Sequence, residues 1–251
     1  MSWVLTVCLA LIAMASGALS SGRHLSVAGA TSVLAYLRQA VPEWEKTHPG
    51  YTVSLSGGGS VAGLVEVSQG RVDLGVSDIP PRAEWTQGRQ LVAVPLGKLP
   101  ILFIAHPGVN PTALSRETLA ALLAGRRRTW PGLGTKVLVM TRPLSSGALN
   151  VVESQILKGQ RMSPEAIVQL SNGAMLAAVR ETPGALGYVE SDHAPRGVTV
   201  LAVGGCAFSA QNPSAWPYYT RPTLYYRPDA PPVVRDLAAF LARPGTGQGA
   251  A

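Results

Sequence analysis

Apolar and polar residues follow a strand–helix–strand pattern in the first third of the chain. Apolar residues alternate with polar ones over residues 51–55, which is the period of a β-strand. Glycines at 57–59 interrupt the strand, and helical spacing begins after Ser60, which we expect to cap the helix. A second strand over residues 72–76 leads to Asp78. The helix N-terminus and Asp78 are therefore expected at one edge of a sheet, where open α/β sheets bind ligands.

A second junction of this kind lies nearer the N-terminus. A short apolar strand over residues 25–27 precedes a turn, and Thr31 or Ser32 is expected to cap a helix that runs to about residue 46. Pro42 should kink or restart that helix. Helix N-termini expose unpaired N–H groups that attract anions. Two such units side by side would form a cradle.

A third junction adds a permanent positive charge. A strand over residues 136–140 runs into Arg142, then into a serine- and glycine-containing turn and a helix over 149–156. The planar arginine fork is suited to oxyanions. Taken alone, a helix cap with a surface arginine explains this junction equally well.

The remaining pattern also alternates strands with helices, which indicates an α/β fold. No internal repeat or low-complexity linker interrupts it. We expect strands or extended segments within 92–106, 182–189, 198–203 and 216–226, and helices over 115–124, 163–170, 174–181 and 232–242.

The glycine-rich turn allows three interpretations. The simplest is a βαβ unit whose glycines only make the turn. A dinucleotide site is the second, because Gly57-x-Gly59-x-x-Ala62 is followed by Asp78 about 20 residues later. A site for a small oxyanion is the third. The turn alone does not decide between them.

Residues 1–20 form an apolar run followed by small residues, which predicts a secretory signal peptide cleaved near residues 15–20. The expected location is therefore periplasmic. The net charge of +7 suits an anionic ligand, a membrane surface or nucleic acid. The run Arg126-Arg-Arg lacks interleaved aromatic residues, so we expect a solvated turn and no nucleic-acid partner.

Enzymatic chemistry finds little support in the sequence. The chain has no G-x-S-x-G motif, no Cys/His cluster with metal-ligand spacing, and scattered histidines. We therefore expect no metal, no cofactor and no catalytic residues.

Short motifs recur in a fixed order along nearly the whole mature chain. They are 29–32 (GATS), 58–63 (GGSxxG), 70–78 (GxVDxGxSD), Gly125 with Trp130, 142–147 (RxxxSG), 182–189 (TPGALGYV), 216–222 (WPxxxRP) and 244–248 (PxxGQ). Each is weak alone, but in this order the chain resembles the phosphate-binding proteins of bacterial ABC importers, within the type 2 periplasmic binding proteins.

The resemblance implies a two-lobed α/β fold of the type 2 periplasmic-binding-protein class, with two crossover strands between the lobes. Lobe one would comprise residues 24–98 plus 207–251, and lobe two residues 106–196. The crossovers would be residues 99–105 and 197–206.

The resemblance also implies a phosphate site between the lobes. The family's contacts fall on Thr31, Ser32, Ser60, Asp78, Arg142, Ser146, Gly147 and Ala148. Two positions differ from the common pattern. Ala148 replaces a frequent threonine, and Leu144 lies where many members carry an acid that braces the arginine.

The implied function is extracytoplasmic capture of inorganic phosphate by a monomer that delivers it to an ABC permease in the inner membrane. Asp78 would accept the proton of hydrogen phosphate and reject sulfate, which has none. The same argument disfavours molybdate, whereas arsenate is not distinguished. Another oxyanion, or a phosphate sensor or scaffold without a transport role, is the alternative.

Overall fold

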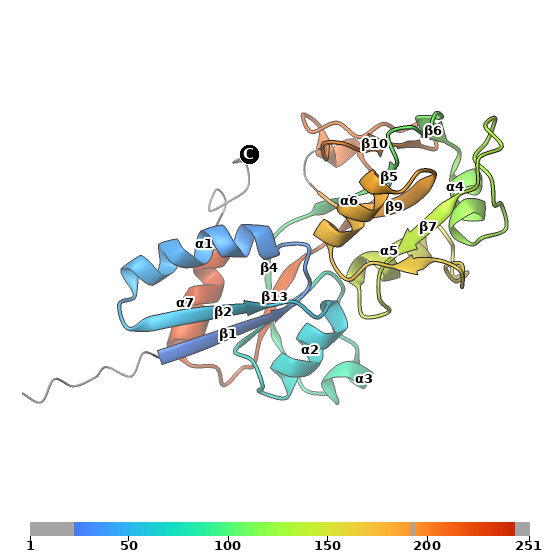
Figure 1. The fold of residues 1–251 in the computed structure, drawn as a ribbon. Helices are drawn as coiled ribbons and strands as arrows, with labels where there is room; N and C mark the ends of the chain where they lie inside the picture. Colours follow the sequence, from blue (N-terminus) through green and yellow to red (C-terminus); the bar gives the residue numbers. More distant parts are fainter. Residues whose placement is uncertain (1–22, 192–193, 244–251) are drawn as a thin grey trace, which may run out of the picture.

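The computed structural model describes residues 23–191 and 194–243. The expected signal peptide and the motif at 244–248 lie outside these residues. The described chain forms two separate α/β halves, each built on its own sheet (Figure 1).

The first sheet has five strands, of which the first three in spatial order pair in parallel and the last two pair antiparallel. Its spatial order is β2 (Tyr51–Ser56), β1 (Arg23–Gly29), β3 (Leu74–Ser77), β13 (Thr223–Tyr226) and β4 (Val92–Pro95). The helices of this half are α1 (Leu34–Thr47), α2 (Ser60–Ser68), α3 (Ala83–Thr86) and α7 (Pro232–Leu241).

Helices cover both faces of this sheet because successive residues of a strand point to opposite faces. Leu224 of β13 packs in the cluster shared by α1 and α7, whereas the adjacent Tyr225 packs with residues of α2. Parallel strands buried in this way present their carboxyl ends to the other half of the molecule, where loops and helix starts meet.

The second sheet is organised around two fully buried strands. Its order is β10 (Thr199–Val200), β5 (Leu99–Ala105), β9 (Ala185–Glu190), β7 (Leu138–Thr141) and β8 (Ile167–Val168), and β12 (Tyr219–Thr220) also pairs with β5. The helices of this half are α4 (Arg116–Leu123), α5 (Gly147–Gln155) and α6 (Asn172–Glu181). A small ribbon, β6 (Ala113–Leu114) with β11 (Ala202–Val203), and the 3₁₀ turn η1 (Pro213–Ala215) complete it.

The chain crosses between the sheets at different places from those expected. The segment 99–105 is not a crossover: it is β5, paired with β9 along its length and buried in the second core. The segment 197–206 also belongs to the second half, through β10 and β11. Trp216 and Tyr218 pack in the second core as well, so the chain crosses at residues 96–98 and again between β12 and β13.

One local expectation was wrong. Residues 163–170 do not form a helix, because Ile167 and Val168 pair in parallel with the end of β7 and satisfy its edge. Pro42 does not restart α1, which is continuous from Leu34 to Thr47. The helix expected over 115–124 is confirmed as α4, and Ser115 caps it: its Oγ accepts a hydrogen bond from the N–H of Thr118 at 3.1 Å.

Candidate functional site

The site lies where strand ends from the two halves meet. Asp78 follows β3 in the first half, while Arg142 follows β7 and Glu190 ends β9 in the second. Direct hydrogen bonds join the halves here. Ser145 donates its Oγ–H to the carbonyl of Gly58 at 3.0 Å, and its carbonyl accepts from the N–H of Val61 at 3.2 Å.

Asp78 is the buried acid that the glycine-rich junction predicted. Only 6% of the residue is exposed. Its Oδ1 accepts from Ser32 Oγ at 2.6 Å and its Oδ2 from Ser60 Oγ at 3.2 Å. Burial raises the pKa of Asp78 above its ordinary value, against the opposing effect of these hydroxyls. The carboxyl is therefore held rigidly, with its charge only partly compensated.

Arg142 reaches across from the second half and is 4% exposed. Its Nη1 donates to Asn172 Oδ1 at 2.9 Å, and its Nη2 donates to Thr31 Oγ1 of the first half at 2.9 Å. Its Nε is buried and has no hydrogen-bond partner among the described residues. A buried donor without a partner is costly, so this nitrogen is suited to an acceptor atom of a ligand.

Glu190 is a second buried acid, which the sequence analysis did not single out. Its Oε2 lies 3.8 Å from Arg142 Nη1, and its carboxyl faces the carboxyl of Asp78. Its Oε1 is buried without a hydrogen-bond partner in the described part of the chain. Burial, followed by repulsion from Asp78, raises the pKa of Glu190 well above its ordinary value.

The N-terminus of α5 closes the site from the second half. Ser146 caps this helix, with its Oγ accepting from the N–H of Leu149 at 3.4 Å. Gly147 lies against the first half so closely that a Cβ built on it would meet Asp78 Cβ at 2.5 Å and Ser60 Oγ at 2.6 Å. The start of this helix, where N–H groups lack partners within the helix, therefore lies against Asp78.

The structure thus gathers the predicted residues around one point between the halves. Asp78 is hydrogen-bonded to Ser32 and Ser60, and Arg142 is hydrogen-bonded to Thr31 across the two halves. Gly147 lies against Asp78 and Ser60, and the buried Ser146 and Ala148 adjoin it on the same helix turn. Their roles towards a ligand stay predictions.

The hydroxyls of the site do not have the helix-capping role expected from the sequence. Thr31, Ser32 and Ser60 are not helix caps: α1 begins after Val33 and α2 after Gly59, both without a side-chain cap. Their oxygens bond instead to Arg142 and Asp78, because those charged partners are buried and need compensation.

Two further residues complete the site. Asn172, at the start of α6, and Glu190 both contact Arg142. They take the role of the bracing acid for which this chain has Leu144. Leu144 itself is 76% exposed. Glu190 could have been predicted in the same way as Asp78, because it is an acid at the carboxyl end of a buried strand. Asn172 could not, because in the sequence it resembles an ordinary turn residue.

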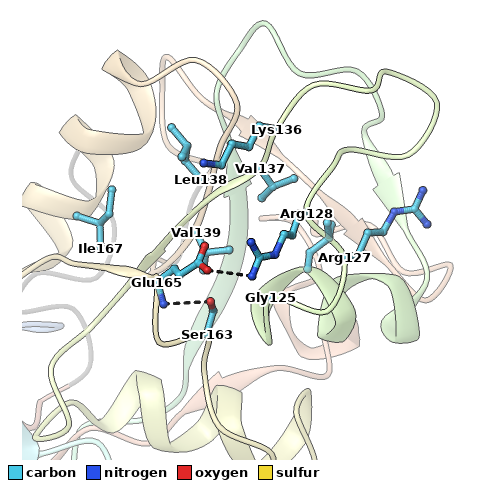
Figure 2. Close-up of a pocket in the computed structure, with 11 residues that line it drawn as sticks. Gly125, Arg127, Arg128, Lys136, Val137, Leu138, Val139, Ser163, Glu165 and Ile167 are labelled. Atoms are coloured by element: carbon cyan, nitrogen blue, oxygen red, sulfur yellow. Dashed lines mark hydrogen bonds and ion pairs between the residues drawn. The ribbon is translucent and has the colours of Figure 1, made fainter.

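A separate hollow lies on the second half, between the arginine-rich loop and β7 (Figure 2). Arg128 points into it and forms an ion pair with Glu165 at 2.9 Å, with both side chains well exposed. The positive charge of Arg128 is thus already compensated, which agrees with a solvated loop rather than an anion site.

None of the helices in residues 23–191 and 194–243 is long and apolar enough to cross a membrane. Over the same residues, no group of three or more His, Cys, Asp or Glu side chains could hold a metal ion.

Residues 15–244 match the sequence model of a PBP superfamily domain, so the chain belongs to that superfamily. It is 25% identical over 234 residues to the phosphate-binding protein PstS of Bacillus subtilis, covering 90% of this chain and 78% of the relative.

Solved structures share the fold. One is a Clostridium perfringens protein described as a phosphate ABC transporter substrate-binding protein with bound phosphate. It has a TM-score of 0.80 and 17% identity, and the match covers 87% of this chain and 93% of that one. An ABC-type phosphate transport receptor from Vibrio cholerae has a TM-score of 0.66 and 21% identity, with 88% and 94% covered.

Proposed function

We propose that this protein captures inorganic phosphate between its two lobes as an extracytoplasmic solute-binding protein for ABC-type import. The observation that carries the proposal is the buried Arg142 guanidinium, whose Nε lacks a hydrogen-bond partner among the described residues. It lies beside hydroxyls of the first lobe and near the N-terminus of α5. The similarity to PstS proteins supports phosphate as the anion.

Each part of the site has a physical role in this proposal. Arg142 supplies a charge-assisted hydrogen bond from Nε, with its orientation fixed by Thr31 and Asn172. The N–H groups of Gly147 and Ala148 donate from the helix start, where the partial positive charge favours an anion. The hydroxyls of Thr31 and Ser146 accept from Arg142 and Leu149, so each keeps an O–H to donate to the anion. Ser32 contributes its backbone N–H, and Ser60 donates once its O–H turns from Asp78 to the anion.

Asp78 sets the selectivity of the site. A buried carboxylate repels a dianion unless a proton lies between them, and hydrogen phosphate carries that proton. Sulfate would leave the Asp78 acceptor facing a second negative charge. Arsenate has the same protons as phosphate and is the rival that this residue does not reject.

Binding, rather than catalysis, is the proposed activity. The hydroxyls of the site are engaged with Asp78, Arg142 and a helix start, and a nucleophile would need an adjacent base to activate it. The proposal also includes export across the inner membrane, action as a monomer, and an ABC permease as partner. The alternative within the same site is a phosphate sensor or scaffold without transport.

The test is calorimetry on the exported form of the chain, stripped of bound anion by partial unfolding and refolding. Phosphate should bind tightly at neutral pH and sulfate should give no heat. Arg142→Ala should abolish phosphate binding, whereas Arg128→Ala, which removes an exposed arginine of the same lobe, should leave it intact. Equal binding of both anions, or of neither, would refute the proposal.

A further inference from the structure

The second acid of the site is placed where it can control the charge that an anion meets. Glu190 ends β9, and its side chain is 2% exposed. Its own backbone is held by Asn172, whose Nδ2 donates to the Glu190 carbonyl at 3.0 Å. The backbone of Glu190 is therefore tied to the start of α6.

The charged and titratable groups around Glu190 come from three elements. Asp78 faces it from the end of β3, and Arg142 faces it from the end of β7. Tyr188 lies two residues earlier on β9. Its hydroxyl is hydrogen-bonded to the hydroxyl of Thr141 and accepts from the N–H of Arg142 at 3.2 Å. Burial raises the pKa of Tyr188, so it stays neutral and adds no charge.

One arginine thus faces two buried acids. It can compensate only one negative charge, and two ionised carboxyls in contact would repel each other strongly at low dielectric. A proton on one of the two carboxyls would remove this repulsion and allow that carboxyl to donate a hydrogen bond to the other. Glu190 has the more strongly raised pKa of the two acids, and it lies 3.8 Å from Arg142.

We propose that Glu190 is a specificity-determining residue of the anion site, which keeps one proton between the lobes and must be neutral for the anion to bind. The inference rests on the proposed function. Neutral Glu190 leaves the site with one positive and one negative side chain before the anion enters. Its unpartnered Oε1 is then a second buried acceptor, besides Asp78, for a protonated oxyanion.

A consequence is that phosphate binding is linked to protons through the protein as well as through the ligand. Once the solution pH exceeds the pKa of Glu190 in the free protein, each binding event must return a proton to this carboxyl. The affinity then falls by about tenfold per pH unit from this group alone. Glu190→Gln keeps a neutral, hydrogen-bonding side chain and removes this linkage.

The test compares phosphate affinity from about pH 5 to about pH 9 in the wild type, Glu190→Gln and Glu165→Gln. The ionisation of phosphate is common to all three proteins and cancels in ratios of their affinities. The ratio of wild type to Glu190→Gln should fall by about tenfold per pH unit in the upper range. Glu165, an exposed acid of the same lobe, is the matched control, and its variant should parallel the wild type.

The possible outcomes separate the two proposals. A ratio that is constant with pH, while phosphate still binds, would overturn the role of Glu190 alone. Failure of the wild type to bind phosphate would overturn both proposals. Should Glu190→Gln not fold, carbon-13 NMR of the glutamate carboxyls in the wild type decides. One glutamate should stay protonated to higher pH when phosphate is added, and ionisation of every glutamate in its ordinary range would refute the inference.

Discussion

Replacing Gly147 by alanine should block closure of the lobes without damaging either lobe. The backbone of Gly147 is not in the left-handed region, so alanine can adopt it, and alanine favours the first turn of α5. The new Cβ would lie 2.5 Å from Asp78 Cβ, whereas ordinary carbon contacts are about 3.5–4.0 Å. The lobes must therefore separate by about 1 Å.

That separation has a calculable cost for a ligand held from both sides. It would stretch the Arg142–Thr31 hydrogen bond from 2.9 Å to beyond hydrogen-bonding distance, together with bonds to an anion from opposite lobes. Hydrogen bonds to charged groups contribute about 1.5–3 kcal/mol each. Loss of two would weaken phosphate binding by at least about 3 kcal/mol, or roughly a hundredfold.

Calorimetry with phosphate and urea unfolding without it would measure the two effects separately. Phosphate affinity should fall at least about a hundredfold, while the free energy of unfolding changes by no more than about 1 kcal/mol. Gly173→Ala is the matched control: it lies in the first turn of α6, and its Cβ would meet nothing closer than 3.9 Å. Wild-type affinity in Gly147→Ala, or a parallel loss of stability, would refute the reasoning.

Three further predictions concern the charged groups. Asp78→Asn should admit sulfate, because the repelling carboxylate becomes a neutral amide, and sulfate titrations that stay silent would contradict its selective role. Arg142→Lys should weaken phosphate binding about tenfold to a hundredfold in calorimetry, since one ammonium cannot replace the contacts to Thr31 and Asn172 together with the free Nε. The native state holds the Glu190 proton more tightly than the unfolded chain does. The free energy of unfolding of the wild type, relative to Glu190→Gln, should therefore fall as pH rises from the ordinary glutamate range through the raised pKa. When this free energy is measured by urea titration at a series of pH values, its difference between the two proteins should change by up to about 1.4 kcal/mol per pH unit. A difference that does not vary with pH would exclude the raised pKa of Glu190.

Much of the site could be predicted because its residues follow strands whose period is unmistakable. Asp78 and Arg142 come directly after buried strands, and α/β sheets bind ligands at the carboxyl ends of their strands. The glycines at 58 and 59 carry positive φ angles of 148° and 91°, as a sharp turn before a helix requires. Gly59 also needs its missing Cβ, which would meet the Ser145 carbonyl oxygen at 2.7 Å.

The parts that could not be predicted depend on contacts between distant segments. A hydroxyl before a helix predicts a cap. The hydroxyls of Ser32, Ser60 and Thr31 instead bond to the buried Asp78 and Arg142, which lie far away in the sequence. The segment 163–170 was expected to be a helix, but Ile167 and Val168 within it form an edge strand because they pair with β7. The two-lobed fold was anticipated from motif order, but the crossing points depended on which sheet the apolar segment 99–105 joins.

The most direct test of the central claim is a crystal structure of the protein grown with phosphate. We predict one phosphate between the lobes, within hydrogen-bonding distance of Arg142 Nε and of the Asp78 carboxyl. Phosphate bound only at the exposed arginine-rich loop, or a site between the lobes that stays empty at saturating phosphate, would contradict the account.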